Sequence, residues 1–337
     1  MINFTSPKGE ICLYLNSAKD YLTHGGDVAN YYVGQFIETN QAVPVIISWQ
    51  TDKKVNTFTI KYSDNQAFID CKILEVDGNV NEISVYNLLK ATEYFVEITA
   101  FYEDGATEKA THSFITMEKG PRPLYIDGIY NTRDVGGYLL PSGKRTKQNL
   151  LFRGGALVPS TGYEKVGLTQ KGKDYMSKTL GVKTEIDFRP PEESESGFES
   201  AIPNAKLVYA VLHGYDAIIN YAEGYKKLFS ILADQDNYPV YMHCTGGADR
   251  TGTVCFLINA LLGVDEKNLI EDYEFTTFSF YDKRSSTSGW TLPLWVKFKD
   301  LINSFNGETL GERIEAMLLS IGITQEEINS LRKIMIG

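Results

Sequence analysis

A short proline-containing segment, Gly120-Pro121-Arg122-Pro123, divides the sequence into two stretches with different hydrophobic patterns. Before it, the runs at 58–63 and 94–102 alternate apolar and polar side chains, which is typical of half-buried strands. Turn-forming triplets such as Asp77-Gly78-Asn79 separate these runs. Many short strands at this spacing predict an all-β sandwich, which we assign to residues 1–118.

After this linker, short apolar strands alternate with helical stretches. Strands are expected at 184–188 and 239–242. Helices are expected at 169–180, 219–233, 251–262 and 266–279, with two more near the C-terminus. This alternation predicts an α/β domain over residues 119–337. Gly263 is expected to end the third of these helices.

Charge and apolar content exclude several classes of protein. The net charge of −10 argues against non-specific binding to nucleic acid or anionic membranes. No stretch approaches the roughly 20 apolar residues of a transmembrane helix. The first seven residues lack the basic region and apolar core of a signal peptide, so we expect a cytoplasmic protein. A secreted or cell-surface protein is the alternative if a leader was trimmed.

The cysteine content fits neither a disulfide scaffold nor a zinc site. A chain of 337 residues has only four cysteines, and no pair has the Cys-x-x-Cys spacing. These cysteines are Cys12, Cys71, Cys244 and Cys255.

The strongest chemical signal is the segment 243–252, which reads His-Cys-Thr-Gly-Gly-Ala-Asp-Arg-Thr-Gly. It follows a predicted strand and opens a predicted helix. Five residues between Cys244 and Arg250 allow the backbone to curl, so that successive N–H groups point at one anion. Two adjacent glycines permit close approach of the backbone. The predicted phosphate-binding residues are Thr245, Gly246, Gly247, Ala248, Asp249 and Arg250.

The position of Cys244 suits a nucleophile. A helix N-terminus and its N–H donors stabilise a thiolate, which is the reactive form of cysteine. The planar guanidinium of Arg250 can hold two phosphate oxygens at once. A lone cysteine is more often a core residue. Here the cysteine, the glycines and the arginine occur together between a strand and a helix, which favours the nucleophile.

This Cys-x5-Arg loop resembles the protein-tyrosine-phosphatase superfamily. Further segments, in the same order, resemble its bacterial atypical tyrosine and lipid phosphatases, with dual specificity, over about 121–337. They are Asn131–Tyr138, Leu151–Leu157, Ile186–Arg189, Glu271–Glu274 and Gly322–Arg332. Gly154 replaces the usual serine of the second segment. Ala248 stands where members that act on lipids often carry lysine.

The resemblance implies roles for several side chains. Thr251 would donate a hydrogen bond to the departing sulfur, and Asp249 would protonate the leaving oxygen. Asp187, at a strand end, is a second candidate acid, although a structural partnership with Arg189 is the favoured alternative. Asp249 could also be structural. Three further residues either reach the site or form supporting ion pairs: Arg133, Asp134 and Arg153.

The predicted enzyme hydrolyses phosphate monoesters through a cysteinyl-phosphate, needs no metal or other cofactor, and releases inorganic phosphate. Protein phosphotyrosine is the first choice of substrate. A phosphoinositide, an inositol phosphate or another small phosphomonoester is the alternative, although Ala248 removes a cation that polyphosphorylated head groups would use. A non-catalytic phosphate-binding pseudophosphatase or an adhesion module is a further alternative.

The first half resembles a fibronectin type III domain. Trp49 precedes a strand-like run, and Leu88, Thr92 and Tyr94 match the tyrosine corner of that fold, with Lys90 in place of the usual proline. Core packing explains both aromatic residues better than ligand binding. We expect this domain to position substrates or partners.

Overall fold

The computed structural model describes residues 1–160, 162–194 and 197–336. Its contacts divide the chain into two compact units. The first unit comprises Met1–Leu13 and Ala42–Lys119, and the second comprises Tyr14–Gln41 together with the chain from Gly120 onward. Sequence analysis had included residues 14–41 in the N-terminal domain. The structure corrects this assignment, because this segment packs on the second unit.

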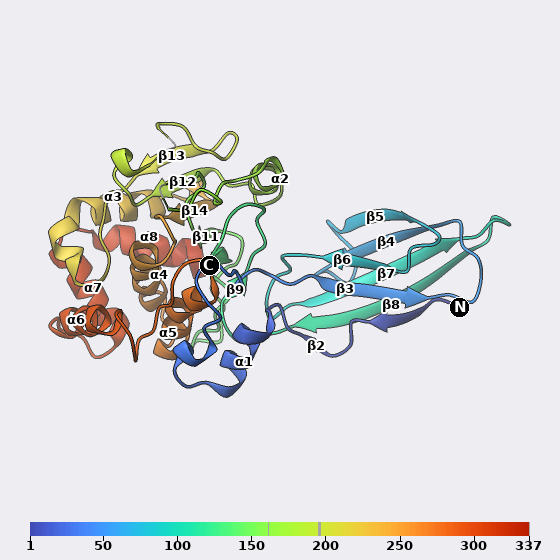
Figure 1. Cartoon of the computed structure of the whole chain (residues 1–337), viewed down its shortest axis with the longest axis horizontal. Coiled ribbons are helices and arrows are strands. Elements are labelled where there is room, and N and C mark those ends of the chain that lie inside the picture. The colour runs from blue at the N-terminus through green and yellow to red at the C-terminus, as the bar shows by residue number, and fades with distance from the viewer. Residues whose placement is uncertain (161, 195–196, 337) are drawn as a thin grey trace. The chain divides into compact units, whose positions relative to one another are not determined.

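The first unit consists of two β-sheets (Figure 1). The three-stranded sheet has the order β1 (Asn3–Ser6), β3 (Val45–Gln50), β6 (Glu82–Val85). The five-stranded sheet has the order β2 (Glu10–Ile11), β8 (Thr107–Thr116), β7 (Glu93–Phe101), β4 (Thr57–Ser63), β5 (Lys72–Asp77).

The alternating pattern of these strands builds their core. Phe58 and Ile60 on β4, and Val96 and Ile98 on β7, are all at most 1% exposed. Trp49 on β3 meets Phe58 edge to face, with ring centroids 5.2 Å apart. Side chains of the two sheets therefore share one hydrophobic interior, as period-two strands require.

The second unit contains a six-stranded mixed sheet. Its order is β13 (Lys206–Tyr209), β12 (Thr184–Asp187), β14 (Val240–His243), β11 (Leu151–Gly154), β10 (Arg133–Asp134), β9 (Arg122–Pro123). The first four strands run parallel, and the last two are antiparallel to their neighbours.

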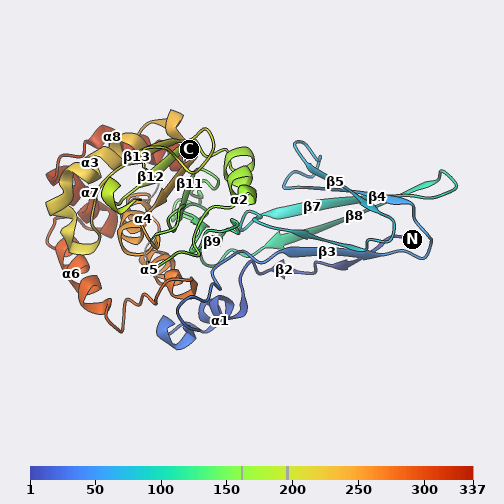
Figure 2. The same cartoon turned by 45° about the horizontal axis from the view of Figure 1, so that its top comes forward.

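Helices cover both faces of this sheet (Figure 2). They are α2 (Gln170–Asp174, extended by one π turn, Tyr175–Thr179), α3 (Ala222–Leu232), α4 (Asp249–Leu261), α5 (Glu266–Glu274), α6 (Leu292–Asn303), α7 (Leu310–Ser320) and α8 (Gln325–Ile336). Short 3₁₀ segments include η3 (Pro191–Glu193), η4 (Tyr215–Tyr221), η5 (Gln235–Asn237) and η6 (Phe275–Phe278). In the described part of the chain, no helix combines the length and the apolar character needed to span a membrane.

The helical prediction differs from the structure mainly at the C-terminus. Three helices follow η6 in the described residues, where sequence analysis expected two. The capping box of Thr309 and Glu312 starts α7 separately from α6. Gly263 follows the end of α4 with φ +87°, and its N–H donates to the Ala260 carbonyl, as predicted for a helix terminus.

Strand β14 is buried on both faces. Val240 and Met242 join the hydrophobic cluster formed with α3, α4, α7 and α8. Tyr241 joins the opposite cluster, which includes Phe152 and Met176. A parallel strand that is covered on both sides has a continuous apolar sequence, which explains why this strand was recognisable.

The segment 14–41 carries α1 (Asn16–His24) and η1 (Val28–Tyr31), which lie beside α5 and η6 in both views (Figures 1 and 2). The Tyr21 hydroxyl donates to Glu274 at 2.5 Å, and the Asn40 side-chain amide donates to the Phe275 carbonyl at 3.0 Å. These bonds join residues more than 230 positions apart in the sequence. Partners so distant in the sequence produce no pattern within residues 14–41. The sequence therefore could not show that this segment belongs to the second unit.

Candidate active site

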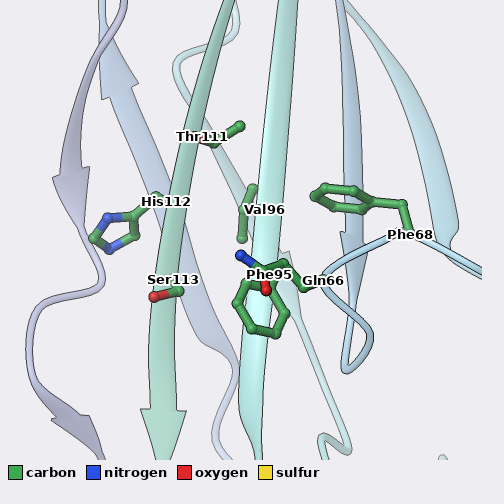
Figure 3. A pocket seen from close by; sticks show the side chains of 7 residues that line it. All are labelled: Gln66, Phe68, Phe95, Val96, Thr111, His112 and Ser113. Carbon is green, nitrogen blue, oxygen red and sulfur yellow. The ribbon is translucent and has the colours of Figure 1, made fainter.

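Two hollows of different character lie in the two units. The larger, about 510 Å³, lies on the five-stranded sheet of the first unit (Figure 3). Its lining residues are Gln66, Phe68, Phe95, Val96, Thr111, His112 and Ser113. The smaller, about 290 Å³, belongs to the second unit and contains Cys244 and Arg250. Chemistry rather than size therefore identifies the second hollow as the candidate active site.

The loop after β14 forms one side of this cavity. The chain leaves the parallel part of the sheet at His243 and enters α4 at Asp249. The carboxyl ends of parallel strands are where α/β proteins place ligands, and the N-terminus of α4 adds a positive end. Five of the six predicted phosphate-binding residues line the cavity: Thr245, Gly246, Ala248, Asp249 and Arg250.

Gly247, the sixth, explains the loop conformation. Its φ is +62°, and a Cβ there would lie 2.1 Å from the carbonyl oxygen of Gly154. The Asn131 amide donates to the Gly246 and Gly247 carbonyls at 2.8 and 3.2 Å, and Arg153 Nη2 donates to the latter at 2.7 Å.

These contacts fix the direction of the loop peptides. The N–H of a trans peptide points opposite to its carbonyl. Asn131 and Arg153 therefore turn the N–H groups of Gly247 and Ala248 away from themselves. No acceptor for these two N–H groups occurs among the described residues. They remain available for an anion, as the Cys-x5-Arg spacing predicted.

The nucleophile candidate and its neighbours have distinct environments. Cys244 is 5% exposed and lines the cavity. The Thr251 hydroxyl is buried and has no hydrogen-bond partner within the described chain, so it is available for the predicted bond to sulfur. Among the described residues, the Arg250 guanidinium pairs with the half-exposed Glu193 carboxylate alone, at 3.3 Å. Such a loose, solvent-exposed pair is weak, so a phosphate can replace it.

Asp249 is held by three donors. Arg284 donates to both carboxylate oxygens at 2.8 Å, and the Tyr215 hydroxyl donates to Oδ1 at 2.6 Å. Burial raises the pKa of Asp249, but the hydrogen bonds and charge of Arg284, with the bond from Tyr215, bring it below its ordinary value. These contacts favour the structural alternative for this residue; its role as the acid stays a prediction.

Asp187 lies outside the lining of the cavity and is fully buried. Arg189 donates from Nη2 to its Oδ2 at 2.7 Å and from the backbone to its Oδ1 at 2.9 Å. Burial raises the pKa of Asp187, but His243 and Arg189 bring it below the ordinary value. The structure thus favours the partnership with Arg189 over an acid at this position.

His243 contacts the start of the loop that contains Cys244. Its Nε2 lies 2.9 Å from Glu185 Oε1, and its Nδ1 lies 3.2 Å from the carbonyl oxygen of Cys244. Burial lowers the pKa of His243, but the carboxylates of Asp187 and Glu185 raise it above the ordinary value. Glu185, which sequence analysis did not single out, thereby helps to position the loop.

The three charged residues left open by the sequence form supporting ion pairs. Asp272 accepts from Arg133 Nε at 2.7 Å and also pairs with Arg153. Burial raises the pKa of Asp272, but both guanidinium groups bring it below the ordinary value. Asp134 instead accepts from Arg122 at 2.8 Å. None of these residues lines the cavity.

Tyr241 explains why position 154 is glycine. Its hydroxyl donates to the Gly155 carbonyl at 2.8 Å. A Cβ at position 154 would lie 2.3 Å from this hydroxyl oxygen. A serine there would collide with the tyrosine.

Several lining residues carried no sequence signal. Tyr163 and Tyr281 contact each other, with ring centroids 5.2 Å apart. Trp290 is half exposed, and the Arg284 guanidinium lies 4.6 Å from its ring. Asp282 is the second carboxylate of the cavity. All these residues come from loops, where hydrophobic periodicity gives no information.

Comparisons with known proteins agree with this geometry. The model of the tyrosine phosphatase family matches residues 124–336. A candidate tyrosine-protein phosphatase of Cupriavidus necator is 27% identical over 185 residues, which cover 46% of this chain and 63% of that protein. The matched region thus spans less than two thirds of that relative.

Solved structures give weaker likenesses. The core catalytic domain of the PP-IP phosphatase SIW14 from S. cerevisiae aligns with TM-score 0.29 and 18% identity, covering 39% of this chain and 76% of that one. The fn3 domain of human collagen alpha-1(XX) aligns with TM-score 0.21 and 21% identity, covering 26% and 79%. The family model, by contrast, covers more than half of the sequence. The chain therefore belongs to the tyrosine phosphatase family.

Proposed function

We propose that this phosphatase hydrolyses protein phosphotyrosine through a cysteinyl-phosphate on Cys244. The observation that carries the proposal is one cavity that joins the buried thiol, Arg250 and the aromatic side chains Tyr163, Tyr281 and Trp290. Aromatic walls favour a flat ring through stacking and edge contacts. Cys244 is almost fully buried, whereas Trp290 is half exposed. A ligand that reaches from the thiol to the indole must be long, and an aryl phosphate meets this condition.

In the first step, the Cys244 thiolate attacks phosphorus, and the bond from phosphorus to the phenolic oxygen breaks. The leaving oxygen receives a proton from a carboxyl group in the cavity. Arg250 and the N–H groups of the loop stabilise the three equatorial oxygens.

In the second step, water attacks phosphorus and the bond to sulfur breaks. The carboxylate takes one proton from the water, and inorganic phosphate leaves. The Thr251 hydroxyl donates to the departing Cys244 thiolate, which fits its unpartnered state. The carboxyl group, the thiolate and one water molecule thus supply and accept all the protons and electron pairs of the two steps.

Phosphoinositides and inositol phosphates remain the second candidate substrates. These molecules carry several phosphate groups, so a site that binds them needs several cationic side chains. The lining of the cavity contains Arg250 and Arg284, but Arg284 is already paired with Asp249, and position 248 is alanine. This charge distribution supports a single phosphate group on an aromatic ring.

The test compares two single-cysteine variants. Wild type should hydrolyse a phosphotyrosine peptide in reductant without added metal, and Cys244→Ser should abolish turnover. Cys255→Ser is the matched control. Cys255 lies within α4, is 1% exposed and does not line the cavity. A wild type that hydrolyses inositol phosphates but no phosphotyrosine would overturn the substrate assignment. Equal loss in both variants would overturn the nucleophile.

We further propose that the first unit is a fibronectin type III-like recognition module. The Leu89 N–H donates to the Tyr94 hydroxyl at 2.9 Å, which is the backbone link expected of a tyrosine corner. Tyr94→Phe should lower the urea midpoint of this unit without changing kcat on a short peptide. A changed kcat would show that the residue acts on the catalytic unit instead.

We also propose that the enzyme works in a reducing compartment such as the cytoplasm. All four cysteines are free, and a thiolate nucleophile is inactivated by oxidation. Localisation by fluorescence of the tagged full-length protein tests this proposal directly.

A further inference from the structure

Two carboxylates line the cavity, Asp249 and Asp282, and they differ in their partners. Asp249 receives hydrogen bonds on both oxygens, two of them from a guanidinium. To protonate a leaving group, Asp249 would first have to bind a proton beside the positive charge of Arg284. A carboxylate bound in this way is stabilised in its ionised form and is a poor proton donor.

Asp282 has the opposite arrangement. Its Oδ1 accepts from the Tyr32 hydroxyl at 3.0 Å and from the backbone N–H of Lys283 at 2.8 Å. No donor reaches Oδ2 from the described residues. One oxygen is therefore fixed while the other can hold a proton. The side chain is half-buried, and no guanidinium group in the described chain donates to its carboxylate.

The loop that carries Asp282 is held from two sides. Arg284 Nη1 donates to the backbone carbonyls of Asp282 and Lys283 at 2.9 and 3.1 Å. Glu38 accepts from the backbone N–H of Phe280. Together with Tyr32, these contacts hold the loop backbone and Oδ1 of Asp282 in place beside the cavity. Preorganisation of this kind is what a proton donor needs.

We propose that Asp282 is the general acid of this phosphatase, that Tyr32 is its positioning residue, and that Asp249 is a structural partner of Arg284. The inference rests on the proposed phosphatase reaction. Asp282 gives its proton to the leaving oxygen while the sulfur–phosphorus bond forms, and then takes a proton from the attacking water. The negative charge of a bound phosphate favours the protonated form of a carboxyl group beside it.

Several charged and titratable groups surround Asp282. Tyr32, Lys283 and Arg284 face it from its own loop and from the N-terminal segment. Asp249, Arg250 and Cys244 line the same cavity. Among these groups of the described chain, only Tyr32 donates a side-chain hydrogen bond to the Asp282 carboxylate.

The test measures kcat/KM of Asp282→Asn and Asp249→Asn on aryl phosphates with different leaving groups. A good leaving group such as p-nitrophenolate needs little protonation, whereas tyrosine needs much. Asp282→Asn should lose about 100-fold or more on phosphotyrosine and far less on p-nitrophenyl phosphate. It should also lose the decline of kcat at high pH. Retained turnover of p-nitrophenyl phosphate shows that the variant is folded.

The other variants separate the possible outcomes. Asp249→Asn should lower both activities by the same factor and keep the pH profile. Tyr32→Phe should move the high-pH decline to higher pH, because it removes a donor to the carboxylate; a purely structural role would leave that pH unchanged. A leaving-group effect confined to Asp249→Asn would overturn the proposal. Absence of wild-type turnover on every aryl phosphate would instead overturn the proposed function.

Discussion

The guanidinium of Arg153 donates to the carbonyl oxygen of Gly247 at 2.7 Å, so a strand outside the cavity holds the phosphate-binding loop. The same guanidinium pairs with the buried Asp272. Loop geometry and domain stability thus depend on one side chain.

Replacement of Arg153 by methionine should destabilise the second unit strongly. Asp272 keeps its ion pair with Arg133 but loses its second guanidinium, and a hydrogen bond to a charged group contributes about 1.5–3 kcal/mol to the free energy of unfolding. Urea denaturation measures this change. The matched control is Lys178→Met, which removes an exposed pair with Asp174 and should cost less than about 1 kcal/mol. Equal effects would contradict the supporting role of Arg153.

Alanine at position 247 should abolish most catalysis. Its Cβ would lie 2.1 Å from the Gly154 carbonyl oxygen, so the loop must move. A displacement of about 1 Å can cost about 100-fold in rate, and we expect at least that loss in kcat/KM. Gly263→Ala is the control: Gly263 also has positive φ, but a Cβ there meets no atom within 4 Å. Activity of Gly263→Ala should stay near wild type.

The two cysteines of the loop and of α4 should differ in alkylation. Burial raises the pKa of Cys255 to about 12, so its thiolate is scarce at neutral pH. Iodoacetamide at pH 7 should modify Cys244 and leave Cys255 intact, and inorganic phosphate should protect Cys244. Trypsin cuts after Arg250 and separates the two cysteines, so mass spectrometry can score each peptide. Faster labelling of Cys255 would contradict its burial.

The ion pair of Arg284 and Asp249 should give a pH-dependent stability. The pKa of Asp249 is lower in the folded protein than its unfolded value of about 3.9. The pair therefore stabilises the fold fully above that value and loses its effect as pH falls through the folded pKa. The difference in unfolding free energy between wild type and Arg284→Gln should be constant from pH 5 to 7 and shrink below about 4.

A double-mutant cycle isolates this contribution. In the Asp249→Asn background, the effect of Arg284→Gln should no longer depend on pH, because the remaining contacts of Arg284, with backbone carbonyl groups and with the Trp290 ring, do not titrate. A pH dependence that persists there would assign the titration to another group.

The sequence could predict whatever depends on neighbours along the chain. The loop from Cys244 to Arg250 is contiguous, lies between a buried strand and a helix, and the structure places both residues in one cavity. The division near residue 119 follows from a change of hydrophobic period. The sequence also favoured the partnership of Asp187 with Arg189, because Asp187 ends a strand and Arg189 follows it by two positions.

The rest of the site comes from partners that are distant in sequence. The fixed state of Asp249 depends on Arg284, and the position of Asp282 depends on Tyr32. Helix α1 buries Ala18 and Tyr21, and its sequence does not indicate which unit it packs on. Tertiary contacts of this kind override local patterns and are visible only in the fold.

The placement of residues 14–41 has a consequence for biosynthesis. Domains generally fold as units, N-terminal first, while the chain is being synthesised. Tyr32, however, is made 250 residues before Asp282, its partner. During that interval the segment can leave the ribosome, but Glu274, Phe275, Asp282 and Ser285, which bind it, have not yet been made. The contact that holds Asp282 at the edge of the cavity therefore forms only when one of the earliest segments meets one of the latest.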